Sequence, residues 1–224
     1  MDKSTRRAQN VIEMSEYQPG PGFPAIAQVE SYWEALRRGR LLPARADVDP
    51  RGIEQALEHA FVLERVAVGV GRIRVAGSHL GALMGMEVRG MPLTCLIAPA
   101  DRPTVARALE ETLQMPAVTT LDLEAPAGIG RGALVARMLL LPLTSDLGDV
   151  SRVLGCLVAR GDIGAAPRRF EVTAVRTVPL APQAAAEPAV RLPEAPGFAE
   201  PQRSFAEAGT TRRPPYLRLV KSDD

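Results

Sequence analysis

The sequence is poor in the residues that build metal sites and disulfide frameworks. Its 224 residues include only two cysteines, Cys95 and Cys156, and two histidines, His59 and His79. Two cysteines in apolar surroundings make no disulfide framework, and a structural zinc site needs three or four converging ligands. We therefore expect no metal and no cofactor, buried unreactive thiols, and histidines that lie at the surface near helix ends.

The chain also lacks an excess of charge and a long apolar run. Its formal net charge is +1, whereas a protein that coats duplex nucleic acid needs clustered lysine and arginine. No apolar run reaches the roughly 18 residues that a membrane span requires, and no apolar segment follows the basic residues within 1–9. These absences predict a reduced cytoplasmic protein with no membrane span, no secretory signal and no nucleic-acid partner.

The residues that the chain has in abundance divide it into parts. Hydrophobic residues make up 46%, which is enough for a packed core, but aromatics make up only 4% while proline and glycine number 20 and 19. We predict a flexible leader over 1–25, a domain over 26–162, and a linker or an extra strand over 163–178. The remainder, 179–224, is rich in Pro, Ala and Glu and is predicted to be a disordered tail with a short apolar segment at 215–220.

Hydrophobic periodicity predicts both helices and strands within the domain. Apolar residues at helical spacing predict helices over 26–38 and 101–114, and Asp49-Pro50 is a typical start for a second, short helix. Runs with the character of strands are 61–67, 72–76, 117–125, 133–143 and 152–160. A hairpin separated by helices from a three-stranded meander predicts an α+β fold, with a five-stranded antiparallel sheet and helices packed on one face.

Two of these elements predict which side chains face the core. The run 72–76 alternates arginine with aliphatic residues, so Ile73 and Val75 are predicted to point inward. The short helix that begins at Asp49 carries one apolar stripe, which is predicted to be buried and consists of Ile53, Ala56, Leu57 and Ala60.

Tryptophan, arginine, glycine and proline residues follow a recognisable order through the domain. The order begins with Trp33, Arg37, Gly39, Pro43, Arg45 and Asp47-Val48-Asp49-Pro50. It continues at the end of the hairpin with Arg74-Val75-Ala76-Gly77-Ser78, Gly85, Gly90 and Met91-Pro92-Leu93. In this order and spacing, residues 29–162 resemble a family of small stand-alone bacterial PAS proteins, and the order of the predicted elements resembles the PAS fold.

This resemblance implies a sensor or interaction module and no shared reaction. PAS domains that bind haem usually carry an axial histidine on the long helix, which here is 101–114 and has none. Photoactive flavin PAS domains need a reactive cysteine in a polar helix, whereas Cys95 lies in an apolar run. The chain has no Gly-x-Ser-x-Gly elbow, and its loop 128–132 does not join a strand to a helix, so we expect no enzyme activity.

The resemblance also points to a site, because PAS domains often place a ligand between the sheet and the helices. The predicted walls of that space are almost all apolar: Leu80, Leu83, Met84, Leu93, Leu96, Val105, Leu109, Met138, Leu140 and Cys156. Such a lining either holds an apolar ligand or is a filled core, and the nearest polar side chains are Thr94 and Thr112.

The first helix carries a candidate interface. Its apolar stripe consists of Ile26, Val29, Trp33 and Leu36. PAS domains commonly form dimers through such a preceding helix, so a homodimer is expected here. The alternative is that the stripe folds back onto its own sheet.

A basic run follows this helix and is a candidate site for an acidic partner or a phosphorylated small molecule. It consists of Arg37, Arg38, Arg40, Arg45 and Arg51. The alternative is a solvated linker in which Arg45 pairs with Asp47 or Asp49.

Three functions remain open from the sequence. The first is a signalling adaptor that acts through protein–protein contacts with a regulatory partner, since the chain carries no output domain. The second is a sensor that binds a small apolar ligand or a nucleotide in the PAS pocket and changes state through differential affinity. The third is a DNA-binding regulator, which would need a helix-turn-helix or a dominant basic face that the sequence does not have.

Overall fold

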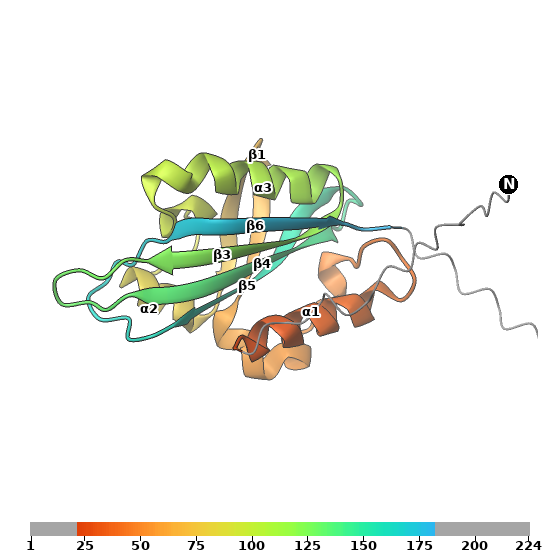
Figure 1. Cartoon of the computed structure of the whole chain (residues 1–224). Coiled ribbons are helices and arrows are strands. Elements are labelled where there is room, and N and C mark those ends of the chain that lie inside the picture. The colour runs from red at the N-terminus through yellow and green to blue at the C-terminus, as the bar shows by residue number, and fades with distance from the viewer. Residues whose placement is uncertain (1–21, 182–224) are drawn as a thin grey trace, which may run out of the picture. The chain divides into compact units, whose positions relative to one another are not determined.

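Six strands form one antiparallel sheet in the computed structural model, which describes residues 22–181 (Figure 1). Their order across the sheet is β2-β1-β5-β4-β3-β6. The strands are β1 (Ala60–Ala67), β2 (Val70–Ala76), β3 (Ala117–Ala125), β4 (Leu134–Thr144), β5 (Val150–Arg160) and β6 (Glu171–Pro179). The α+β antiparallel architecture expected from the sequence is confirmed, with two differences: a sixth strand, and helices on both faces of the sheet.

Helices and short 3-10 segments fill the connections. The α-helices are α1 (Pro24–Arg37), α2 (Ser78–Met84) and α3 (Arg102–Gln114). The 3-10 segments are η2 (Arg45–Asp47), η3 (Pro50–His59), η4 (Leu93–Leu96) and η5 (Pro99–Asp101). The start predicted at Asp49-Pro50 is present, because the Asp49 side chain accepts a hydrogen bond from the backbone N–H of Arg51 at 3.0 Å. None of the described helices is long and apolar enough to cross a membrane.

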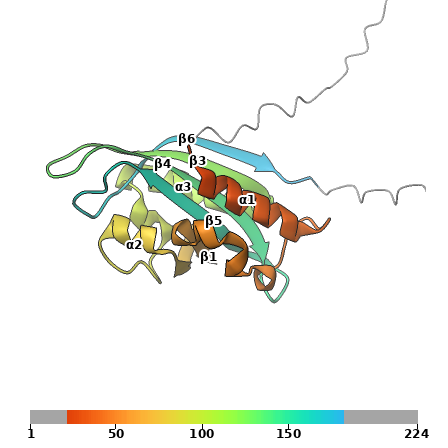
Figure 2. The same cartoon turned by 90° about the horizontal axis from the view of Figure 1, so that it is seen from below.

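Both faces of the sheet are covered, and each cover has its own apolar core. On one face α3 crosses the strands, and its core also takes in α2 and η4. On the opposite face α1 lies over β4 and β5 beside η3 (Figure 2). The sheet needs cover on both faces because residues 138–143 of β4 are buried without a break. A strand that is apolar on both sides has to be covered on both sides. The expectation of helices on one face is therefore corrected.

The sixth strand occupies part of the segment for which the sequence left a linker or a strand open. β6 pairs with β3 and forms the edge of the sheet, so the fold extends past residue 162 to Pro179. At the other end, α1 begins at Pro24, inside the predicted leader. The predictions of a flexible leader, a disordered tail and an apolar segment at 215–220 otherwise lie outside the described residues.

An irregularity in the β1–β2 hairpin changes which way Val75 points. Val62 pairs with Val75, but Leu63 pairs with Ile73, so Arg74 is an extra residue in β2. Side chains alternate between faces along a strand, and one inserted residue reverses the alternation beyond it. Ile73 accordingly belongs to the α3-side core, whereas Val75 lies 51% exposed beside Val62 on the α1 side. The prediction that Val75 points inward with Ile73 is wrong for this reason.

Candidate functional site

The space between the sheet and α2, η4 and α3 is a filled core. Nine of the ten residues predicted to line it are buried together there: Leu80, Leu83, Met84, Leu93, Leu96, Val105, Leu109, Met138 and Leu140. A void of about 20 Å³ beside Leu93 and Leu109 is room for about one water molecule. The side chains of these nine residues pack against one another in this space.

Cys156 is the exception among those ten residues, because its side chain lies on the opposite face of β5. It is buried in the α1-side core with Leu154 and Val158, and burial raises the pKa of its thiol to about 12. Burial also raises the pKa of Cys95. Both thiols are thus protonated at neutral pH and unsuited to nucleophilic chemistry.

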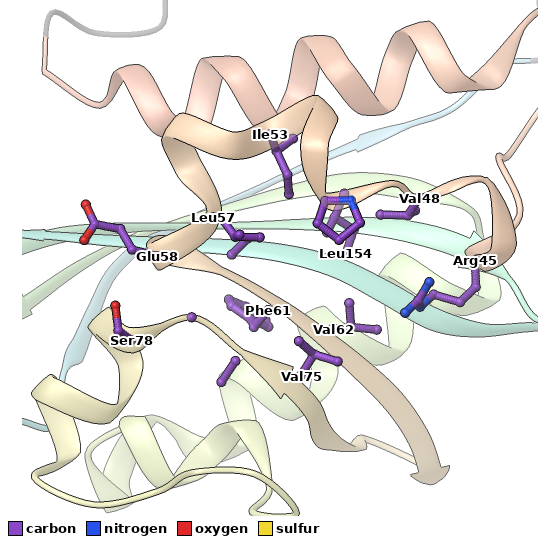
Figure 3. Close-up of a pocket in the computed structure, with 14 residues that line it drawn as sticks. Arg45, Val48, Ile53, Leu57, Glu58, Phe61, Val62, Val75, Ser78 and Leu154 are labelled. Carbon is purple, nitrogen blue, oxygen red and sulfur yellow. The ribbon is translucent and has the colours of Figure 1, made fainter.

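An open groove of about 550 Å³ lies on the α1 side of the sheet, over the β1–β2 hairpin, of which β2 is the edge strand (Figure 3). Its walls come from η2, from η3, from both strands of the hairpin, from the start of α2 and from β5. They consist of Arg45, Val48, Pro50, Ile53, Leu57, Glu58, Ala60, Phe61, Val62, Val75, Ala76, Gly77, Ser78 and Leu154. Apolar side chains dominate this list, so the groove is a surface on which apolar groups of another molecule can be buried.

Two aliphatic side chains make the groove accessible. Val75 is 51% exposed and Leu57 is 43% exposed, although both were predicted to be buried. Val75 reaches the groove because of the extra residue Arg74, and Leu57 lines the groove from η3. No signal in the sequence indicated the groove, because the exposure of Val75 depends on the register shift at Arg74.

The two ends of the groove carry opposite charges. Arg45 and Glu58 stand on opposite sides of the apolar side chains (Figure 3). The carboxylate of Asp47, one expected partner of Arg45, instead accepts a hydrogen bond from Arg40 at 2.6 Å, and this contact lowers the pKa of Asp47. Asp49 caps η3. Within residues 22–181 Arg45 therefore makes no ion pair.

The Glu58 end of the groove is a tight seam between η3 and the start of α2. The backbone N–H of Gly77 donates to the carbonyl oxygen of Ala60 at 2.8 Å. A Cβ atom at Gly77 would lie 2.2 Å from the carbonyl oxygen of Glu58, so only glycine permits this approach. The backbone thereby fixes the position of the Glu58 end relative to the hairpin.

The two histidines lie near helix ends, as expected, and their rings meet beside this seam. The rings of His59 and His79 are 4.5 Å apart in an edge-to-face arrangement. Nε2 of His79 accepts a hydrogen bond from the backbone N–H of Ala159 at 3.1 Å, and Nε2 of His59 lies 3.3 Å from a carboxylate oxygen of Glu58. Burial, and then the neighbouring His59, lower the pKa of His79. Because each histidine is next in sequence to a groove residue, their packing supports this end of the groove.

Comparison with known proteins decides the family. A family model described as a PAS domain matches residues 23–158, which is more than half of the chain. The chain belongs to the PAS domain family. The resemblance noted from Trp33 to Leu93 is thereby confirmed, and the family indicates a signalling or sensory regulatory role. No curated protein matches the chain.

In this PAS domain the apolar stripe of the first helix is used internally. Ile26, Val29 and Trp33 are buried against β4 and β5. Trp33 also donates a hydrogen bond to the carbonyl oxygen of Pro142, and Leu36 is half-buried. The stripe therefore folds back onto its own sheet, which is the alternative to a dimer interface. These buried side chains are not available for the dimer that was expected through them.

The five arginines after the first helix of the PAS domain differ in their burial and in their partners. Arg37 is buried, lies 5.5 Å from the Trp33 ring and pairs with Glu34 at 2.9 Å. Arg40 pairs with Asp47, whereas Arg38 and Arg51 are exposed. Of the five, only Arg45 lines the groove. Arg45 is therefore the member of this run that the groove brings next to apolar side chains.

The loop at 128–132 borders a small pocket of about 130 Å³, which Arg131 lines together with residues 167–169. Gly128 and Arg131 form a short bridge between β3 and β4, as expected of an inter-strand loop. Across 22–181, no three His, Cys, Asp or Glu residues converge as metal ligands would.

Proposed function

We propose that this PAS protein is a non-enzymatic regulatory adaptor that acts through contacts with another protein. The observation that carries the proposal is the contrast between the two faces of the sheet. The core on the α3 side is filled, whereas the α1 side has an open apolar groove at the edge of the sheet. Exposed apolar surface rimmed by polar residues is typical of protein interaction sites.

A small-molecule sensor is the second candidate, and one observation favours it. The groove volume of about 550 Å³ falls within the range of small-ligand sites, roughly 300–1,000 Å³. Such sites, however, enclose most of the surface of their ligand, and the half-exposed Leu57 and Val75 leave this groove open. On the α3 side, where the resemblance left a ligand site or a filled core open, the void beside Leu93 and Leu109 holds only about 20 Å³.

The deciding experiment compares capture of partners by the full chain and by two variants. Val75→Asp places a charge in the groove, and Val68→Asp places the same charge on a 73% exposed residue that does not line the groove. Crosslinking of bait proteins in cell extract, followed by mass spectrometry, is expected to recover partners with wild type and Val68→Asp and to lose them with Val75→Asp. Circular dichroism melts check that both variants fold.

Native mass spectrometry of the purified chain provides the opposing outcome. An unliganded mass agrees with an adaptor. A small molecule that co-purifies with wild type and is absent from Val75→Asp would replace the adaptor proposal with the sensor. Partners that bind Val75→Asp as well as wild type would also overturn the proposal.

A further inference from the structure

The groove is built asymmetrically, and this asymmetry specifies its partner. We propose that it binds a short amphipathic segment of another protein, which places apolar side chains on Leu57 and Val75 and an acidic side chain on Arg45. This inference rests on the proposed function, since it names the chemistry of the partner that the adaptor contacts. It adds the chemical class of the bound segment and the orientation in which the segment binds. It also names Arg45 as the residue that selects the acidic side chain.

Arg45 is the first reason to expect an acidic group. It is half-buried at one end of the groove, and within the described residues it has no ion pair. The nearby carboxylates are already used, because Asp47 binds Arg40 and Asp49 caps η3. A guanidinium beside apolar walls binds a carboxylate more strongly than a solvated one does, because water screens the pair less.

Glu58 is the reason to expect a fixed direction. Its side chain is 63% exposed at the opposite end, and its contact is with its neighbour His59. A carboxylate on the partner would be repelled at that end and attracted at Arg45. A donor or a basic side chain is favoured beside Glu58, so the two charges select one of two possible orientations of the bound segment.

The open shape of the groove favours a protein segment over a free amphiphile. Leu57 and Val75 remain about half exposed, so an occupant that lies only in the groove would keep much of its own apolar surface in water. A protein segment carries flanking residues that can cover the rim and exclude water from the apolar contacts. The apolar centre and the two charged ends together match a segment with apolar residues on one side and charges of opposite sign at its ends.

The test uses the full chain and synthetic peptides labelled with a fluorophore. Each 14-residue probe has three leucines at helical spacing, glutamate near one end and lysine near the other, and the pair of probes covers both polarities. A third probe has glutamine in place of the glutamate. A fourth, the doubly basic probe, has lysine in place of the glutamate and so carries two lysines. Fluorescence anisotropy is expected to show one polarity bound at least tenfold more tightly than its glutamine version.

Charge reversal then identifies the residue that selects the acidic group. Arg45→Glu is expected to weaken binding of the glutamate probe at least tenfold and to bind the doubly basic probe more tightly than wild type does. Arg51→Glu is the matched control, since Arg51 is an exposed arginine on η3 that does not line the groove, and it should leave both affinities within twofold. Arg45→Gln, which adds no new charge, should give an intermediate loss.

Three outcomes would overturn the inference. These are no probe binding above a scrambled peptide, equal loss from Arg45→Glu and Arg51→Glu, and saturable binding of dodecanoate that displaces the peptide. Any of them can occur while partner capture is still lost in Val75→Asp, in which case the adaptor function stands and only the chemistry of its partner is wrong. Capture that is insensitive to Val75→Asp would instead remove the proposed function itself.

Discussion

The indole Nε1 of Trp33 donates a 3.0 Å hydrogen bond to the carbonyl oxygen of Pro142, 109 residues away in the sequence. The bond joins α1 to the part of β4 where the strand is buried on both faces. Trp33 is 1% exposed and is the only tryptophan of the chain. It therefore closes the α1-side core, beside which the groove is formed.

Replacing Trp33 is expected to destabilise the fold without dissociating any dimer. Trp33→Ala should lower the free energy of unfolding by about 3–5 kcal/mol, because a large buried side chain leaves a cavity. Trp33→Phe should cost less, about 1–2 kcal/mol, mostly from the unpaired carbonyl oxygen. Urea denaturation followed by circular dichroism measures both, and sedimentation gives the oligomeric state. Unchanged stability with a change from dimer to monomer would show that the stripe is an interface after all.

Glu110 on α3 is expected to hold the β1–β2 hairpin in place. It is buried and accepts hydrogen bonds from Arg65 on β1 and, at 2.8 Å, from the backbone N–H of Gly69 in the hairpin turn. Glu110→Ala should lower the free energy of unfolding by about 2–4 kcal/mol, because Arg65, Gly69 and also the Gln114 amide lose their acceptor. Urea denaturation measures this loss, and Glu111→Gln, at the next and only half-buried position of α3, should cost less than a quarter as much.

Glu110 is also expected to cause part of the loss of folding stability at low pH. The hydrogen bonds from Arg65, and then from Gly69, hold the pKa of Glu110 below its ordinary 4.5. Below pH 4.5 the unfolded chain takes up a proton that the folded chain does not, so stability falls as the pH falls through that window. In Glu110→Gln this part of the decline should be missing from denaturation curves recorded between pH 5 and pH 3. An unaltered decline would contradict the assignment.

Glu30 on α1 is expected to act in the opposite direction. Burial, and then the neighbouring Glu34, raise its pKa to about 7, while Arg176 on β6 lowers it. Between pH 4.5 and 7 the unfolded chain has released a proton that the folded chain keeps, so stability falls as the pH rises through this window. Glu30→Gln should be more stable than wild type at pH 8, by about 1–2 kcal/mol after allowance for solvent screening.

The measurement for Glu30 is a pair of thermal melts at pH 5 and pH 8. The difference between wild type and Glu30→Gln should be larger at pH 8 than at pH 5. Glu54→Gln on the exposed side of η3 is the control and should show no such pH dependence. A variant that is less stable than wild type at pH 8 would mean that the attraction to Arg176 outweighs burial.

His79 is expected to weaken the groove in mild acid. Its pKa lies below the ordinary 6.5, so from pH 6.5 downward the unfolded chain gains a proton first and stability falls with the pH. Protonation on Nε2 would also place two donors, this N–H and that of Ala159, against each other. Of the charged groups that influence His79, His59 opposes its protonation and Glu58 favours it.

His79→Gln tests this, because its side-chain oxygen can accept the Ala159 hydrogen bond at every pH. Between pH 7.5 and 5.5, wild type should lose stability and peptide affinity, while His79→Gln should lose less of both. The window separates this effect from that of Glu110, which begins two pH units lower. Equal losses of stability and affinity in the two proteins would show that protonation of His79 does not cause them.

Local structure was predictable wherever it depends on neighbours in the chain. Asp49 and Pro50 begin η3 because one accepts the Arg51 N–H and the other suits a first helical turn. The alternation of leucine with acidic residues over 117–125 specified β3. The order of residues from Trp33 to Leu93 also sufficed to indicate the PAS family, because that order can be read from the sequence alone.

Only the tertiary structure decided which face each side chain occupies. The unbroken apolar run at 138–143 shows that β4 is buried, but it does not say that α3 covers one side and α1 the other. The single extra residue Arg74 places Val75 in the groove instead of the core. The fold also brings the rings of His59 and His79 into contact, although the two residues are 20 positions apart in the sequence. Hydrophobic spacing records how apolar each position is. Strand register and long-range packing, which determine what covers it, are set by contacts between segments distant in the sequence.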